Sequence, residues 1–157
     1  MRVHEAIDFT VKHDDGQDVQ DLNMADIVLV GVSRTSKTPL SLYLATKGYM
    51  VANIPLIEGV DPPEILFAIE QDRIVGLTID VRQLVNIRIS RLRNIKQSTH
   101  CSYTEYEMVK AELTYFKRLY RENRKWLVVD MTNKAIEEVA AEIMQKFQKN
   151  SFFNLHE

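Results

Sequence analysis

The chain has 157 residues, of which 45% are hydrophobic and 27% charged, which fits one ordinary globular domain and excludes a disordered chain. Its 20 lysines and arginines nearly balance 22 acids, and the net charge of -2 gives no global reason to expect nucleic acid or an anionic membrane as a partner. The single cysteine, Cys101, excludes an intrachain disulfide and suits a reducing cytoplasm, and no apolar run is long enough to span a membrane.

The first segment, residues 1–24, has the pattern of a short amphipathic helix followed by a polar connector. Val3, Ile7 and Val11 recur every four residues, which predicts a helix with this stripe as its apolar face. The polar run over residues 13–18 predicts a turn. We interpret residues 1–24 as the helix and connector left from a missing N-terminal domain.

From residue 25 onwards, short apolar runs alternate with helical patterns. Runs of this kind are typical of strands buried on both faces of a parallel sheet, and they cover residues 27–30, 51–54, 74–79 and 126–129. Helices are expected over residues 40–47, 62–70, 81–93, 104–122 and 136–147. This alternation predicts a three-layer α/β domain of the P-loop kinase-like type, with a mostly parallel sheet, over residues 25–150 and a tail at 151–157.

The most specific pattern lies between the first strand and the helix that follows it. Phosphate-binding loops have a lysine and a hydroxyl residue at the end of a glycine-containing turn; Lys37 and Thr38 take these places here, with Ser36 where glycine is usual. In such a loop backbone N–H groups hold phosphate, the lysine reaches the terminal phosphates and the hydroxyl holds Mg²⁺. The alternative is a plain polar turn with a solvated lysine. The predicted nucleotide-binding residues are Gly31, Val32, Ser33, Arg34, Thr35, Ser36, Lys37 and Thr38.

Three further residues near strand ends each have more than one possible role. Arg34 either contacts a phosphate and stabilises charge in the transition state or is a surface arginine. Asp80 follows a strand at the edge where α/β sheets bind ligands, so it could hold Mg²⁺ or accept a proton from an attacking hydroxyl, and capping of the next helix is an equal alternative. For Asp130, which also follows a strand, capping or turn formation is the favoured role.

Residues 82–96 contain arginines and a lysine but no acid. Arg88 and Arg91 lie three residues apart and share one helical face. Such a face could form a lid that contacts phosphates or dock a phosphorylated partner, and the alternative is a solvated basic surface. Nucleic-acid binding is not expected from this patch alone.

Taken together, these motifs resemble one family, the bifunctional regulatory protein of pyruvate, phosphate dikinase. Serine in the place of Ser36 also occurs in that family, and its members usually carry an N-terminal domain before this point. The resemblance covers nearly the whole chain. The matching segments are residues 13–16 (HDDG), 25–39 (ADIVLVGVSRTSKTP), 43–45, 48–49, 51–53, 76–78 and 88–93.

The resemblance implies a cytoplasmic phosphotransferase that is both a protein serine/threonine kinase and a phosphorylase. The kinase moves the β-phosphate of ADP to a threonine of the dikinase and inactivates it, and the phosphorylase removes that phosphate with inorganic phosphate and releases pyrophosphate. A sister branch acts on phosphoenolpyruvate synthase, and family members can pair as homodimers. The resemblance adds Asp14 and Asp15 as catalytic candidates. With the residues predicted from the local pattern, the catalytic set is Lys37, Asp15, Asp14, Arg34 and Asp80, and Thr38 and Asp80 are the expected Mg²⁺ ligands.

Two other functions are compatible with the same loop. A small-molecule P-loop kinase would share the loop, the acid at a strand end and an arginine lid, but would phosphorylate a small acceptor. A nucleotide sensor without catalysis would bind ADP and transfer nothing.

Overall fold

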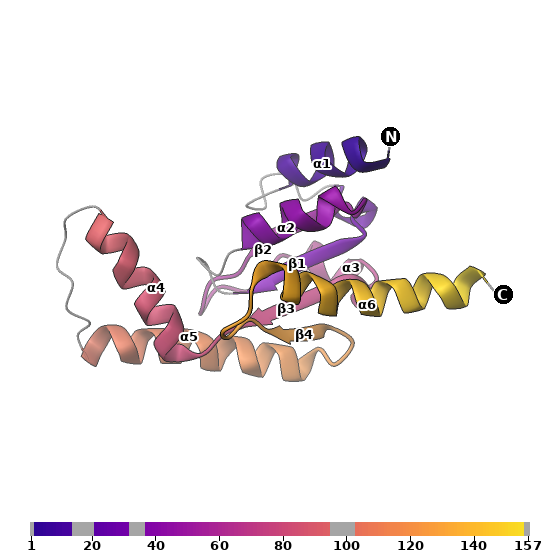
Figure 1. Cartoon of the computed structure of the whole chain (residues 1–157). Helices are drawn as coiled ribbons and strands as arrows, with labels where there is room; N and C mark the ends of the chain where they lie inside the picture. The colour runs from indigo at the N-terminus through magenta and orange to yellow at the C-terminus, as the bar shows by residue number, and fades with distance from the viewer. Residues whose placement is uncertain (1, 14–20, 32–36, 95–102, 156–157) are drawn as a thin grey trace.

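The computed structural model describes residues 2–13, 21–31, 37–94 and 103–155. Helices and strands alternate along most of this length, as the apolar runs predict (Figure 1). The elements are α1 (Arg2–Lys12), the 3-10 turn η2 (Leu22–Met24), β1 (Ile27–Gly31), α2 (Lys37–Thr46), β2 (Val51–Pro55), α3 (Glu64–Ala68), the 3-10 turn η3 (Gln71–Arg73), β3 (Ile74–Thr78), α4 (Val81–Asn94), α5 (Tyr103–Glu122), β4 (Leu127–Asp130) and α6 (Ile136–Leu155).

The described strands form one four-stranded sheet in the order β2-β1-β3-β4, and every pairing is parallel. This confirms the predicted α/β class. The chain leaves β1 towards β2 on one side and returns to β3 on the other, which creates a topological switch point between β1 and β3. In open α/β sheets, ligands bind outside the carboxyl ends of the strands at such a point. The residues aligned across that end of the sheet are Pro55, Gly31, Leu77 and Val129.

Helices cover both faces of the sheet, so the domain has three layers (Figure 1). Alternate residues of β1 point to opposite faces. Ile27 and Leu29 pack in a core cluster with α2 and α6, and Val28 and Val30 pack in a second cluster with α3 and α5. All five residues of β1 are buried, which explains why this strand is an unbroken apolar run.

Helix α1 forms as predicted, but its buried face is not the predicted stripe. Val11 is 61% exposed and Val3 39% exposed, while Phe9, Thr10 and His13 are buried. The reason is the open edge of β2, whose outward N–H groups need acceptors once α1 covers them. The Thr10 hydroxyl oxygen accepts from Val51 N at 3.1 Å, and the His13 carbonyl accepts from Asn53 N at 3.0 Å. Residues predicted to lie outside the domain therefore pack onto its edge strand.

Several helix ends differ from the prediction, three of them by three or more residues or for a physical reason that the structure shows. Helix α2 begins at Lys37 rather than at residue 40, because Pro39 is tolerated in a first turn, where its missing N–H is not needed. Helix α3 ends at Ala68 and does not reach residue 70, because the Gln71 side-chain amide donates to the Leu66 and Ile69 carbonyls (3.0 and 2.8 Å). Helix α6 continues to Leu155, across the predicted tail.

Helix α4 and the first half of α5 project beyond the carboxyl end of the sheet and diverge from each other away from it (Figure 1). The end of α6 projects in the opposite direction, beyond the amino ends of the strands (Figure 1). Within the described part of the chain, no helix combines the length and apolarity needed to cross a membrane.

Candidate functional site

Gly31 ends β1 at the switch point, and its conformation requires glycine. Its φ angle is +148°, a region that side chains with a Cβ rarely adopt. A Cβ placed there would lie 2.9 Å from the Leu77 carbonyl oxygen and 3.3 Å from the Tyr120 hydroxyl. The chain can therefore turn sharply out of β1 while staying against β3, as a loop that opens onto a ligand must.

Lys37, the first residue of α2, points back to the end of β1. Its Nζ donates to the Gly31 carbonyl oxygen at 3.2 Å, and the side chain is half-buried. The same turn is tied to β2, because the Ser41 hydroxyl donates to the Thr38 carbonyl at 2.8 Å and Asn53 Nδ2 donates to the Ser41 hydroxyl at 3.2 Å. Thus Gly31, Lys37 and Thr38 lie together at the carboxyl end of the central strand, with a helix N-terminus beside them.

Asp80 follows β3 at the same edge of the sheet, and it caps α4. Its Oδ2 accepts from Gln83 N at 3.2 Å, the N-cap geometry named among its alternatives. Its backbone N donates to the Thr132 hydroxyl oxygen at 2.8 Å, which ties the β3–α4 turn to the β4–α6 turn. The carboxylate is exposed, so capping leaves it accessible from solvent.

Asp130 forms the turn that supports this junction, as predicted. Its Oδ1 accepts from the Thr132 hydroxyl at 2.6 Å and from Thr132 N at 2.9 Å. Partial burial alone would raise the pKa of the Asp130 carboxyl, but these hydrogen bonds, helped by the charges of Lys134 and Lys117, outweigh it and hold the pKa below its usual value. Asp130 is therefore occupied in positioning Thr132 and the backbone of Asp80.

Arg88 extends from α4 to α5 and forms an ion pair with Glu112, with Nη1 3.0 Å from Oε2. The pair braces the projecting helices α4 and α5 against each other. A phosphate contact by Arg88 stays a prediction, as does any contact of Arg91, whose side chain lies outside the described part of the structure.

Several predicted site residues lie outside the described residues: Asp14, Asp15, Val32, Ser33, Arg34, Thr35 and Ser36. The neighbour of the acidic pair, His13, is buried at the end of α1, where its Nδ1 donates to the Phe9 carbonyl at 2.8 Å and its ring stacks on Phe9. Because its carbonyl accepts a hydrogen bond from Asn53 N, His13 fixes the end of α1 beside β2.

The described residues contain no group of three acidic, histidine or cysteine side chains that could form a complete metal site. Mg²⁺ does not need one, because it usually keeps several waters and takes one or two carboxylates together with substrate phosphates. Thr38 and Asp80 are exposed residues that follow β1 and β3 at one edge of the sheet, and an oxygen ligand from each residue type fits that kind of binding. Bound there, the ion would neutralise charge on the phosphates.

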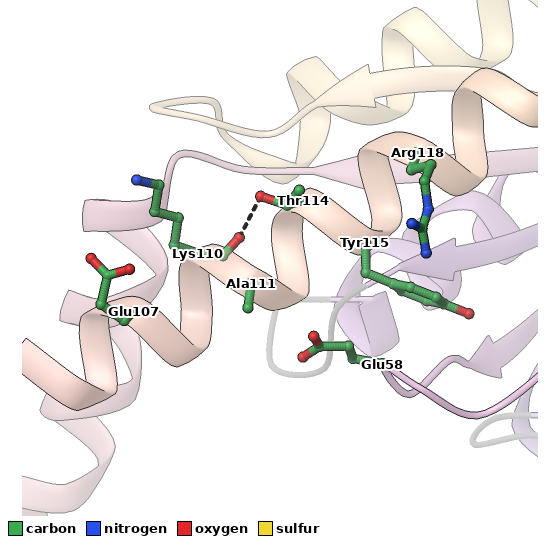
Figure 2. Close-up of a pocket in the computed structure, with 7 residues that line it drawn as sticks. All are labelled: Glu58, Glu107, Lys110, Ala111, Thr114, Tyr115 and Arg118. Atoms are coloured by element: carbon green, nitrogen blue, oxygen red, sulfur yellow. Dashed lines mark hydrogen bonds between the residues drawn. The ribbon is translucent and has the colours of Figure 1, made fainter.

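The sequence predicted the helix α5 but not the groove along it. A cavity of about 410 Å³ lies between α5 and Glu58, and it adjoins one of about 620 Å³ that shares Tyr115 and Arg118 (Figure 2). The Tyr115 hydroxyl donates to the Val60 carbonyl at 3.4 Å, which joins the loop after β2 to the helix. Lys110 and Arg118 line the first cavity, and neither forms an ion pair with a described side chain. Helix α5 carries as many acidic as basic residues, so the charge pattern of the sequence gave no signal for this groove.

The fold and site together define a doubly wound α/β domain with a candidate phosphate-binding turn at its switch point. The family model described as Kinase/pyrophosphorylase matches residues 1–144. The chain belongs to this kinase/pyrophosphorylase family.

Relatives support the assignment across most of the chain. It is 60% identical over 142 residues to the Pelobacter propionicus protein named "Putative pyruvate, phosphate dikinase regulatory protein", covering 90% of this chain and 51% of that protein. A protein of the same name from Geobacter metallireducens is 59% identical, and the match covers 90% of this chain and 53% of that protein. A third, from Bdellovibrio bacteriovorus, is 50% identical, and the match covers 90% of this chain and 50% of that protein. The chain thus spans about half the length of the curated relatives it matches.

Proposed function

We propose that this chain forms the nucleotide-binding and phosphoryl-transferring part of an ADP-dependent protein kinase and phosphorylase that regulates pyruvate, phosphate dikinase. The observation that carries the proposal is the pairing of Gly31 and Lys37 at the switch point between β1 and β3, in a chain of the kinase/pyrophosphorylase family. A lysine held beside the end of the central strand, at a helix N-terminus, supports phosphate binding there. The names of the relatives support the dikinase as the partner, with phosphoenolpyruvate synthase as the alternative.

In the kinase direction, the hydroxyl oxygen of a threonine of the dikinase attacks the β-phosphorus of ADP. The bond from that phosphorus to the oxygen of AMP breaks, AMP leaves and the threonine proton passes to a carboxylate base. In the phosphorylase direction, an oxygen of inorganic phosphate attacks the phosphothreonine phosphorus, the threonine oxygen leaves with a proton, and pyrophosphate is the product. Both directions place negative charge on a moving phosphoryl group, which a nearby cation stabilises.

The proposed roles divide among the residues at this edge. Lys37 binds the phosphates and neutralises their charge, together with the backbone N–H groups of residues 31–38 and with Arg34. Asp14, Asp15 and Asp80 are the candidate bases, and Thr38 and Asp80 are the proposed Mg²⁺ ligands. Arg88 and Arg91 are proposed phosphate contacts from α4, and in the structure Arg88 pairs with Glu112 through Nη1.

A protein acceptor also needs a docking surface, and the groove along α5 is the proposed one. Lys110 and Arg118 lie in it without ion-pair partners among the described side chains, although the whole chain carries a slight net negative charge. Glu58 and Glu107 line the same cavity, so a segment of the dikinase that carries charges of both signs would complement it. Figure 2 shows Tyr115 and Arg118 extending from the same side of α5, next to Glu58.

The proposal is tested by incubating the chain with phosphohistidine-form dikinase and ADP labelled in its β-phosphate. We expect label on a dikinase threonine with the wild-type chain and none with Lys37→Ala. Lys47→Ala is the matched control, since Lys47 is an exposed lysine at the other end of the same helix and is expected to leave transfer unchanged.

Calorimetric titration with ADP separates the alternatives. Binding of ADP without transfer to either partner enzyme would favour the nucleotide sensor, and transfer to a small acceptor would favour a small-molecule kinase. A chain that binds neither ADP nor inorganic phosphate would refute the proposal.

A further inference from the structure

Tyr120 of α5 is a buried polar side chain directly beneath the switch point. Its hydroxyl donates to the Leu77 carbonyl of β3 at 2.8 Å, and the same oxygen lies 3.5 Å from the Val30 carbonyl of β1. Tyr120 is only 6% exposed. Burial raises the pKa of the hydroxyl well above its ordinary value, so the group stays protonated and remains a donor at any physiological pH.

Two glycines of the central strands make room for this side chain. A Cβ on Gly76 would lie 2.6 Å from a carbon of the Tyr120 ring, closer than real Cβ contacts allow. A Cβ on Gly31 would lie 3.3 Å from the Tyr120 hydroxyl oxygen and 2.9 Å from the Leu77 carbonyl oxygen. The ring itself is held between Phe116 and Trp126, with ring centroids 6.3 and 6.2 Å away.

The contacts of Tyr120 lead directly to Lys37. Leu77, whose carbonyl accepts the hydrogen bond from the Tyr120 hydroxyl, is the register partner of Gly31 on the neighbouring strand. The carbonyl of Gly31 in turn accepts from Lys37 Nζ at 3.2 Å. The Tyr120 hydroxyl therefore lies beneath the carboxyl ends of β1 and β3, beside the candidate phosphate-binding residues. A shift of these strand ends would move the Gly31 carbonyl, which accepts the hydrogen bond from Lys37.

We propose that Tyr120 is a positioning residue for the phosphate site, which fixes the carboxyl ends of β1 and β3 so that Gly31 and Lys37 keep the geometry for a terminal phosphate. The inference rests on the proposed function for its nucleotide. On this inference, helix α5 helps to hold the β-phosphate of the nucleotide and has no role in holding its nucleoside.

The test compares Tyr120→Phe with Ile143→Val by calorimetric titration of ADP and AMP, at a temperature where both variants are fully folded. Tyr120→Phe keeps the ring and removes only the hydroxyl. Ile143→Val removes one methylene from the fully buried core on the α6 side, so it serves as a control for a modest loss of stability. We expect the Kd for ADP to rise about fivefold to tenfold in Tyr120→Phe, the Kd for AMP to change by less than about twofold, and neither to change in Ile143→Val.

Equal weakening of ADP and AMP, or an unchanged Kd for ADP, would overturn the positioning role. A second readout does not depend on nucleotide: amide hydrogen exchange at Leu77 and Gly31 should be faster in Tyr120→Phe than in Ile143→Val. If the wild-type chain fails to bind ADP, the proposed function fails while the exchange experiment still decides whether Tyr120 fixes the two strand ends. Equal exchange in both variants would contradict the inference.

Discussion

At the scale of single residues, the site depends on positions where only one residue type fits its surroundings. Gly31 combines a φ of +148° with a close approach to β3, and Gly76 leaves space for the Tyr120 ring. The sequence showed Gly31 as the start of a loop, but it gave no reason for Gly76, because the ring that occupies its space comes from a helix far along the chain.

We expect Gly31→Ala to lower the free energy of unfolding by at least about 2 kcal/mol more than Gly59→Ala does. Both glycines have positive φ, at +148° and +82°, but a Cβ at Gly59 would meet nothing within 4 Å. The pair therefore separates the clash with Leu77 from the cost of the backbone conformation. Urea denaturation of both variants measures their free energies of unfolding. Equal losses of this free energy would show that the backbone of Gly31 can move away from β3.

At the scale of elements, the strands and most helices follow from local pattern. Apolar runs located β1 to β4 within about one residue at each end. The predicted buried face of α1 was wrong, because the pattern of Val3, Ile7 and Val11 reports the apolarity of the residues alone. The edge of β2 needs hydrogen-bond acceptors rather than apolar surface, and Thr10 and His13 supply them.

Substitution on the two faces of α1 tests this orientation. Thr10→Val keeps the shape of the side chain but leaves the buried Val51 N–H without its acceptor, so we expect a loss of about 1–3 kcal/mol in the free energy of unfolding. The opposite change at the adjacent, 61% exposed position, Val11→Thr, should alter it by less than about 0.5 kcal/mol. Thermal denaturation of both variants is the measurement, and a larger effect at residue 11 would mean that the predicted stripe is the packed face after all.

At the scale of the whole molecule, parallel strand order brings distant residues to one edge. Gly31, Lys37, Asp80 and Thr132 come from three separate strand-to-helix turns and meet because the carboxyl ends of parallel strands lie together. The groove along α5 arises in the same way, since the loop after β2 reaches across to Tyr115.

The docking proposal belongs to this scale. We expect the double variant Lys110→Glu/Arg118→Glu to raise the KM for the dikinase by about tenfold or more, because the first cavity already holds Glu58 and Glu107 and would then present only negative charge to the docked segment. The Kd for ADP should stay within about twofold. Arg124→Glu/Lys125→Glu is the matched control, since both are exposed cations outside the two cavities and should leave KM near the wild-type value. An equal rise in both double variants would point to net charge rather than to the groove.

The sequence by itself determined the class of the fold and the position of the candidate phosphate turn. Both are local properties: a buried parallel strand must be apolar on both faces, and a phosphate turn needs its glycine, lysine and hydroxyl close together along the chain. For Asp80 the sequence left the role open, and the structure adds the helix cap without deciding the chemistry.

Only the tertiary structure decided which distant side chains support that turn. Tyr120 and Phe116 lie in the same core cluster, and nothing in their spacing along α5 distinguishes them. The Tyr120 hydroxyl acquires its contact because the packing of α5 against the sheet places it beside Leu77, and Arg88 acquires Glu112 because α4 packs beside α5. Helical spacing determines which residues share a face, but the partner of that face depends on how the elements pack, which no local pattern contains.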